Sequence, residues 1–169
     1  DIKSLISWSA IGGQSEAKRA LIETVETPFK YAELYEHYNK KPIRGCLLWG
    51  APGCGKTMLG RALAKSLADM HKVEVSESGF VYVKSPEVLQ KYVGTGEGMI
   101  RNLFQKARKH KEQHGYPAVI FFDEAELFKK RGTGVSSDVH DTLVATLLAE
   151  MDGMEAWGSI VIMATNRPD

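Results

Sequence analysis

The chain has 169 residues, which is enough for one domain with a substantial hydrophobic core. Charged residues make up 25% and the formal net charge is +1, so the composition excludes an overall field that would attract nucleic acid or a membrane surface. The longest apolar runs, residues 118–122 and 160–164, are too short to span a bilayer, and the first residues are not expected to form a signal peptide. The 2 cysteines, Cys46 and Cys54, are expected to be free thiols in a reducing compartment, which predicts a cytoplasmic protein.

Hydrophobic periodicity predicts helices and strands that alternate along most of the chain. Residues 1–13 are expected to be extended or irregular, a helix follows over residues 14–26, and Pro28 ends it or begins a second helix that runs to Tyr38. The expected strands cover residues 45–49, 80–84, 118–123 and 159–165. The expected later helices cover residues 56–70, a stretch from Ser85, residues 97–114, a short stretch that ends at Lys130, and residues 137–151. Expected loops cover residues 71–78, 94–96 and 131–136. This alternation, with apolar inner strands, predicts an α/β fold whose parallel sheet is covered on both faces.

The most informative motif is GAPGCGKT at residues 50–57, which matches the phosphate-binding pattern G-x-x-x-x-G-K-[ST] at every position. An expected strand precedes it and an expected helix follows. In that setting glycines let backbone N–H groups surround an anion at a helix N-terminus. Lys56 is then placed to reach the β- and γ-phosphates of a nucleotide, and Thr57 to hold Mg²⁺. The alternative is a glycine–proline turn between two core elements, which both flanks disfavour.

Two further strands end next to polar residues that such a loop needs as partners. The third strand ends in Asp123 and is followed by Glu124, and active sites of open parallel sheets lie at the carboxyl ends of strands. Asp123 is expected to accept from Mg²⁺-bound water, and Glu124 to polarise a water in line with the γ-phosphate. The fourth strand is followed by Asn166, which is expected to hold that water or a γ-phosphate oxygen. The alternative for Asp123 and Glu124 is an ordinary helix N-terminus, where acidic residues are favoured. The alternative for Asn166 is an ordinary Asn-Arg-Pro turn.

Two other features are interpreted as ordinary surface. His110 and His114 lie four residues apart on an expected helix, but the residues between them fit no zinc-ligand motif, so a solvated helix end is expected. The basic side chains within residues 106–111 have no aromatic residues between them. They are interpreted as an exposed face or a subunit interface rather than a nucleic-acid site.

Taken together, these motifs resemble the large nucleotide-binding subdomain of the AAA family of ATPases, in its classical branch, along nearly the whole chain. Residues 42–45 resemble the family's lead-in to strand one, residues 148–153 its subunit-contact helix, and residues 165–168 its sensor strand. Residues 131–139 and the pore-loop region are most similar to the bacterial proteasomal ATPases. The resemblance implies a P-loop NTPase fold, a three-layer αβα sandwich with strand order 1-4-3-2 in which the family's fifth strand is missing.

The resemblance also implies a set of site residues. Glu124, Lys56 and Asn166 would be catalytic, and Thr57 with Asp123 would hold the metal. The nucleotide would be bound by an adenine-pocket stretch and by the phosphate loop, which together comprise Ile11, Gly12, Gly13, Pro52, Gly53, Cys54, Gly55, Lys56, Thr57 and Met58. The implied ligands are ATP and Mg²⁺. The chain departs from the family at Ala10, which replaces an acid, and at Cys54, which replaces a common threonine.

Lys-Tyr-Val-Gly at residues 91–94 resembles the family's first pore loop, whose aromatic residue grips a polypeptide in the central channel of a hexamer. Tyr92 and Val93 would then hold a translocating protein substrate. The alternative is that Tyr92 caps a helix against the core. The implied function is the ATP-binding and ATP-hydrolysing core of a homo-hexameric unfoldase or remodelling motor. Its implied partners are a protein substrate and a protease, with no membrane and no nucleic acid.

Residues 1–169 are expected to be a large subdomain that is truncated after the sensor strand, so that the helical lid and the arginine fingers are absent. The fragment alone is therefore expected to be a weak ATPase, because a finger arginine contributes about 10³–10⁵ in rate. One alternative is a nucleic-acid motor or clamp-loader-type ATPase, which the near-neutral charge and Tyr92 disfavour. Another is a non-hydrolysing nucleotide-binding module, which the intact Glu124 disfavours.

Overall fold

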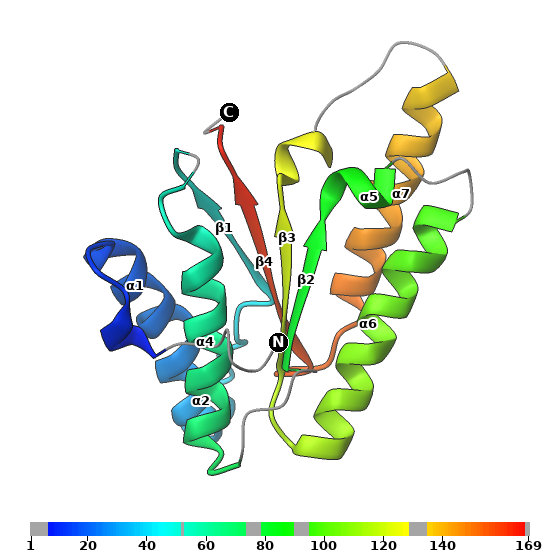
Figure 1. The fold of residues 1–169 in the computed structure, drawn as a ribbon. Helices are drawn as coiled ribbons and strands as arrows, with labels where there is room; N and C mark the ends of the chain where they lie inside the picture. The colour runs from blue at the N-terminus through cyan, green and yellow to red at the C-terminus, as the bar shows by residue number, and fades with distance from the viewer. Residues whose placement is uncertain (1–6, 52, 74–78, 90–94, 129–134, 168–169) are drawn as a thin grey trace.

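In a computed structural model of the chain, a parallel sheet lies between two layers of helices (Figure 1). The structure describes residues 7–51, 53–73, 79–89, 95–128 and 135–167. The order of strands across the sheet is β1-β4-β3-β2, and each neighbouring pair is parallel. This confirms the expected α/β sandwich and its strand order. The strands are β1 (Gly45–Trp49), β2 (Phe80–Lys84), β3 (Ala118–Asp123) and β4 (Ser159–Thr165), with the bounds that the sequence predicts.

The helices divide between the two faces of the sheet (Figure 1). One face carries α1 (Ser15–Leu21), α2 (Thr27–Lys30) and α4 (Lys56–Met70), with the short α3 (Ala32–His37) following α2. The other face carries α5 (Ser85–Leu89), α6 (Thr95–His114) and α7 (Val135–Asp152). Three short turns complete the described elements, η2 (Trp8–Ala10), η3 (Ile22–Glu26) and η5 (Ala125–Phe128). No helix within the described residues is long and apolar enough to cross a membrane.

Strand β3 lies at the centre of the hydrophobic core. Residues 118–122 are all fully buried, because both faces of the strand are covered. Val119 and Phe121 pack with the residues of α4, whereas Ile120 and Phe122 pack with those of α6 and α7. Burying one such side chain stabilises a fold by roughly 1.5–3 kcal/mol, so this alternation of large apolar residues holds both helical layers to one strand.

The ends of several helices differ from the expectation. α6 begins at Thr95, so part of the expected loop at residues 94–96 is helical. A Cβ atom on Gly96 would lie 2.7 Å from Leu143 Cδ2 and 2.9 Å from the carbonyl oxygen of Val88. A glycine at this position therefore lets α6 begin in close contact with α5 and α7. Similarly, α7 begins at Val135, inside the expected loop of residues 131–136.

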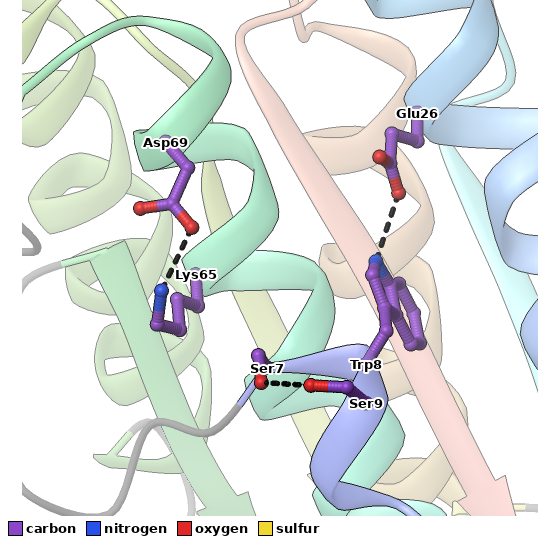
Figure 2. A network of polar contacts seen from close by, with 6 residues as sticks. All are labelled: Ser7, Trp8, Ser9, Glu26, Lys65 and Asp69. Atoms are coloured by element: carbon purple, nitrogen blue, oxygen red, sulfur yellow. Dashed lines mark hydrogen bonds and ion pairs between the residues drawn. The ribbon is translucent and has the colours of Figure 1, made fainter.

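The N-terminal part of the chain also differs from the expectation. Residues 8–10 form a 3₁₀ turn, where extended or irregular backbone is expected. The expected helix over residues 14–26 is divided into α1 and a single π-helical turn, η3. Pro28 lies in the first turn of α2, where proline is tolerated because its missing N–H has no helical acceptor. The Trp8 indole donates a hydrogen bond of 2.9 Å to Glu26, and Figure 2 shows this contact and, separately, the Lys65–Asp69 pair of α4.

The expectation of a solvated helix end is wrong for His110, whose side chain is 1% exposed. Its ring lies 4.6 Å from Tyr116 in an edge contact and 4.7 Å from His114, measured between centroids. His110 follows Ala107 by three residues and so continues the buried stripe of α6, and Tyr116 then folds back against it. Burial, with the neighbouring His114, lowers the pKa of His110 to about 4. Among the described residues no group of three or more His, Cys, Asp or Glu side chains is placed to hold a metal ion.

We expect the free energy of unfolding to fall as the pH is lowered from 6.5 towards about 4. The pKa of His110 is lower in the folded chain than in the unfolded chain, so the unfolded chain binds the extra proton first and is favoured by acid. The loss from this one group is at most about 3 kcal/mol. Urea unfolding across this pH range measures it. His110→Phe should flatten the dependence, whereas His37→Gln, at an exposed position, should keep the wild-type slope. Equal slopes for His110→Phe and wild type would contradict this assignment.

Candidate functional site

The phosphate loop joins β1 to α4 at the carboxyl end of the sheet. Gly53 and Gly55 have φ angles of 76° and 89°, in the left-handed region that favours glycine. A Cβ atom on either glycine would meet nothing within 4 Å, so the constraint is backbone conformation rather than space. Gly55 immediately precedes α4, a helix of 15 residues whose N-terminus carries a partial positive charge. The local structure therefore has the form of an anion-binding loop.

Lys56 is the first residue of α4, and only 9% of it is exposed. Its ammonium donates to the carbonyl oxygens of Gly50 at 2.7 Å and Ala51 at 3.2 Å. It also donates to Asn166 Oδ1 at 3.0 Å, across 110 residues of sequence. A buried ammonium requires such acceptors, because burial without them is costly. Lys56 therefore connects the phosphate loop to the residue that follows β4.

The acidic pair lies at the carboxyl end of β3. Asp123 Oδ1 accepts the backbone N–H of Glu124 at 2.9 Å, and Oδ2 accepts the hydroxyl of Tyr82 at 2.5 Å. Partial burial of Tyr82 and the adjacent Asp123 carboxylate raise the pKa of the tyrosine to about 12, so its hydroxyl remains a donor. Glu124 has a φ of 56° and an exposed side chain. Asp123 is thus held by two donors, while Glu124 remains accessible to solvent.

One cavity of about 360 Å³ brings these parts together. It is lined by Gly53, Cys54, Gly55, Lys56, Thr57, Asp123, Glu124 and Asn166. These residues lie at or just beyond the carboxyl ends of three different strands, and the sequence predicts a role for every one of them. The wall combines backbone N–H groups and an ammonium with two carboxylates and a hydroxyl. Such a set of groups can hold phosphate oxygens on one side and a hard divalent cation on the other.

The predicted adenine-pocket residues lie outside this cavity. Ile11 is 5% exposed and packs in the core with α4, and the ammonium of Lys18 donates to its carbonyl. The side-chain amide of Gln14 donates to the carbonyl oxygen of Cys54, which links this stretch to the phosphate loop. A separate cavity of about 630 Å³ is lined by residues 14–17 and 47–49. Ile11, Gly12 and Gly13 are therefore adjacent to the loop without lining either cavity.

Four predicted site residues remain to be placed. Met58 is 41% exposed and does not line the cavity that holds the phosphate loop. Pro52, Tyr92 and Val93 lie outside the described residues. Tyr82 and Gln14 contact site residues and were not expected from the sequence. Two facts together would identify Tyr82 as a contact of Asp123. The strand order places β2 beside β3. Because side chains alternate between the two faces of a strand, Tyr82 and Asp123 then lie on the same face of the sheet.

Residues 46–169 match the family described as "ATPase family associated with various cellular activities (AAA)". The chain is 44% identical over 173 residues to the proteasome-associated ATPase of Frankia casuarinae and 44% identical over 170 residues to that of Nakamurella multipartita. It is 43% identical over 175 residues to that of Mycobacterium tuberculosis. Each alignment covers 97% of this chain and 28% of the relative, so the chain spans little more than a quarter of the length of these proteins.

This chain belongs to the AAA family of ATPases, since the family match covers most of its residues. The predicted resemblance is therefore confirmed. The likeness to bacterial proteasomal ATPases, expected from residues 131–139 and the pore-loop region, agrees with the names of these relatives.

We expect a maleimide to label Cys54 before Cys46. Burial raises the pKa of the Cys46 thiol to about 11, so only a small fraction of Cys46 side chains is in the reactive thiolate form near neutral pH. Cys54 instead lines the cavity, where its sulfur lies 3.8 Å from the Lys56 ammonium. Mass spectrometry of the chain after brief labelling measures the order, and Cys54→Ser and Cys46→Ser variants serve as controls. Faster labelling of Cys46 would contradict the loop geometry.

Proposed function

We propose that this AAA-family chain is the ATP-binding and ATP-hydrolysing core of a hexameric protein unfoldase. In this proposal residues 1–169 act as the large nucleotide-binding subdomain of a longer protein. The observation that carries it is the single cavity in which the phosphate loop meets Asp123, Glu124 and Asn166. The relatives named proteasome-associated ATPases support it, and they are more than three times as long as the matched segment.

Phosphate binding follows from the partners of Lys56. Its ammonium now donates to the neutral carbonyl oxygens of Gly50 and Ala51 and to the neutral amide of Asn166. A phosphate oxygen carries negative charge, so it attracts the ammonium more strongly than these neutral oxygens do. The β- and γ-phosphates of ATP would therefore displace some of these acceptors. The N–H groups at the start of α4 would bind the remaining oxygens.

Magnesium fits the other side of the cavity. Mg²⁺ prefers oxygen ligands and commonly combines one or two carboxylates with water and substrate phosphates. Asp123 and Thr57 both line the cavity and both supply oxygen atoms. Two carboxylates beside a polyphosphate repel it, and a divalent cation between them offsets that repulsion. Thr57 and Asp123 would hold this ion, which would screen the charge of the transferred phosphoryl group.

Hydrolysis is assigned to Glu124 and Asn166. Glu124 is exposed beside Asp123, so its carboxylate can accept a hydrogen bond from a water in the cavity. As the bond from that water to the γ-phosphorus forms and the bond to the bridging oxygen breaks, Glu124 takes up the proton and ADP leaves. Once a phosphate has taken the place of Asn166 on Lys56, the Asn166 amide would orient the water or a γ-phosphate oxygen.

The remaining parts of the proposal concern the assembled protein. In it, Tyr92 and Val93 grip a protein substrate in the central pore of a homo-hexamer, and a protease partner receives that substrate. The adenine base is bound near Ile11, Gly12 and Gly13, which are linked to the phosphate loop through Gln14. We place the protein in the cytoplasm, in agreement with the free thiols of Cys46 and Cys54.

Lys56→Ala should weaken ATP binding by roughly 10- to 150-fold, because it removes charge-assisted contacts worth about 1.5–3 kcal/mol. Isothermal titration calorimetry of the chain with ATP and Mg²⁺ measures the change. Lys65→Ala is the matched control, since Lys65 lies on the same helix and pairs with the partly exposed Asp69 at 2.8 Å. Equal affinities of wild type and Lys56→Ala would exclude the phosphate site.

Two substitutions in the longer protein separate hydrolysis from unfolding. Glu124→Gln should preserve ATP binding and nearly abolish both hydrolysis and unfolding, because an amide cannot take up the proton. Tyr92→Ala should preserve hydrolysis and stop the unfolding of a tagged test protein. Steady-state ATPase and unfolding assays measure the two activities, with Glu112→Gln, at an exposed position of α6, as control. Normal turnover in Glu124→Gln would remove that residue from the mechanism, and normal unfolding by Tyr92→Ala would contradict the pore assignment.

A further inference from the structure

We propose that Tyr82 is a positioning residue for metal-linked nucleotide binding, because its hydroxyl orients the Asp123 carboxylate. The inference rests on the proposed function, since it concerns the residue assigned there to the metal. It adds a side chain from β2, a strand none of whose residues lines the phosphate-loop cavity, and this side chain acts through Asp123, which does.

The register of the sheet places Tyr82 within reach of Asp123. Tyr82 lies opposite Phe121, and Lys84 lies opposite Asp123, so Tyr82 and Asp123 are diagonal neighbours on one face of the sheet. Diagonal pairs are separated by about 7–8 Å, a gap that an aromatic side chain can span. The hydroxyl of Tyr82 reaches Asp123 Oδ2 at 2.5 Å. The contact thus follows from the pairing of β2 with β3.

The ring of Tyr82 is itself held in place. It stacks on Phe121, with ring centroids 6.0 Å apart and an angle of 14° between the planes. Phe121 is fully buried in β3, so the surface that supports Tyr82 is part of the core. A donor on a fixed ring constrains its acceptor more than a donor on a long flexible chain does, because little rotamer freedom remains.

The two donors on Asp123 leave it able to bind a cation. Tyr82 donates to Oδ2 and the Glu124 N–H donates to Oδ1, so each oxygen keeps one further acceptor position. Together they determine the plane of the carboxylate and therefore the direction of the free positions. Hydrogen-bond donors behind metal-binding carboxylates commonly orient the ligand in this way.

Packing alone does not explain a tyrosine here. Tyr82 is 39% exposed, so its ring adds less to the core than a fully buried side chain would. Phenylalanine could stack on Phe121 equally well. The hydroxyl is the group that a phenylalanine lacks, and the hydrogen bond that it donates ends on Asp123.

The test is calorimetry of ATP binding to the chain, with Mg²⁺ and with EDTA in its place. In wild type, Mg²⁺ should increase the affinity. Tyr82→Phe keeps the ring and should reduce that increase roughly tenfold, while changing the affinity in EDTA less than about twofold. Tyr38→Phe, at a residue that is 66% exposed and distant in sequence from the site, should match wild type in both conditions.

A double-mutant comparison separates positioning from general stability. In an Asp123→Asn background, adding Tyr82→Phe should not change the response to Mg²⁺ any further, because the oriented carboxylate is already absent. An undiminished Mg²⁺ effect in Tyr82→Phe, or an equal loss with Mg²⁺ and EDTA, would overturn the role of Tyr82 alone. A wild-type chain that binds ATP without any Mg²⁺ effect would overturn the metal assignment of the proposed function as well.

Discussion

The complete burial of residues 118–122 of β3 is the constraint on which the rest of the site depends. Its backbone pairs with β2 on one side and β4 on the other, and residues 118–122 have no exposed surface. A shift of its register by one residue would exchange the side chains that face the two helical layers and so disrupt the packing on both faces. The acidic residues Asp123 and Glu124 follow directly, so their position at the carboxyl end of the sheet is fixed. The phosphate loop must then meet them there, because β1 is parallel and lies in the same sheet.

Charge balance explains how a single cavity can hold groups of both signs. Lys56 is satisfied within the protein by loop carbonyls and by Asn166, and Asp123 is satisfied by Tyr82 and a backbone N–H. Lys56 and Asp123 have different hydrogen-bond partners and are not bonded to each other, so the ammonium and the carboxylate are kept apart. In the proposed function, an anionic phosphate and a divalent cation would take up the separated charges. The arrangement prepares a site for ligands of both signs instead of closing it with an internal ion pair.

The contact between Lys56 and Asn166 has a further consequence for function. It joins the loop after β1 to the residue after β4, and the backbone N–H of Gly50 donates to the carbonyl of Thr165 at 3.2 Å beside it. A phosphate that competes for the ammonium of Lys56 would release the Asn166 side chain. Phosphate bound in the loop would in this way change the contacts of Asn166, the residue that follows β4. The fold therefore provides a short physical connection between nucleotide binding and the end of β4.

The sequence by itself determined the features that depend on near neighbours in the chain. The pattern of apolar residues gives the bounds of all four described strands and of α4, and the glycines of residues 50–57 predict an anion-binding loop. Tertiary structure decided the features that depend on distant partners. His110 is buried because Tyr116 folds back over α6, and Tyr82 meets Asp123 across 41 residues of sequence. Periodicity identifies which face of a helix or strand is apolar, but it does not identify the partner that covers that face. That partner is chosen by the pairing of strands and the packing of layers, so Tyr82 and His110 acquire their roles only in the folded sheet.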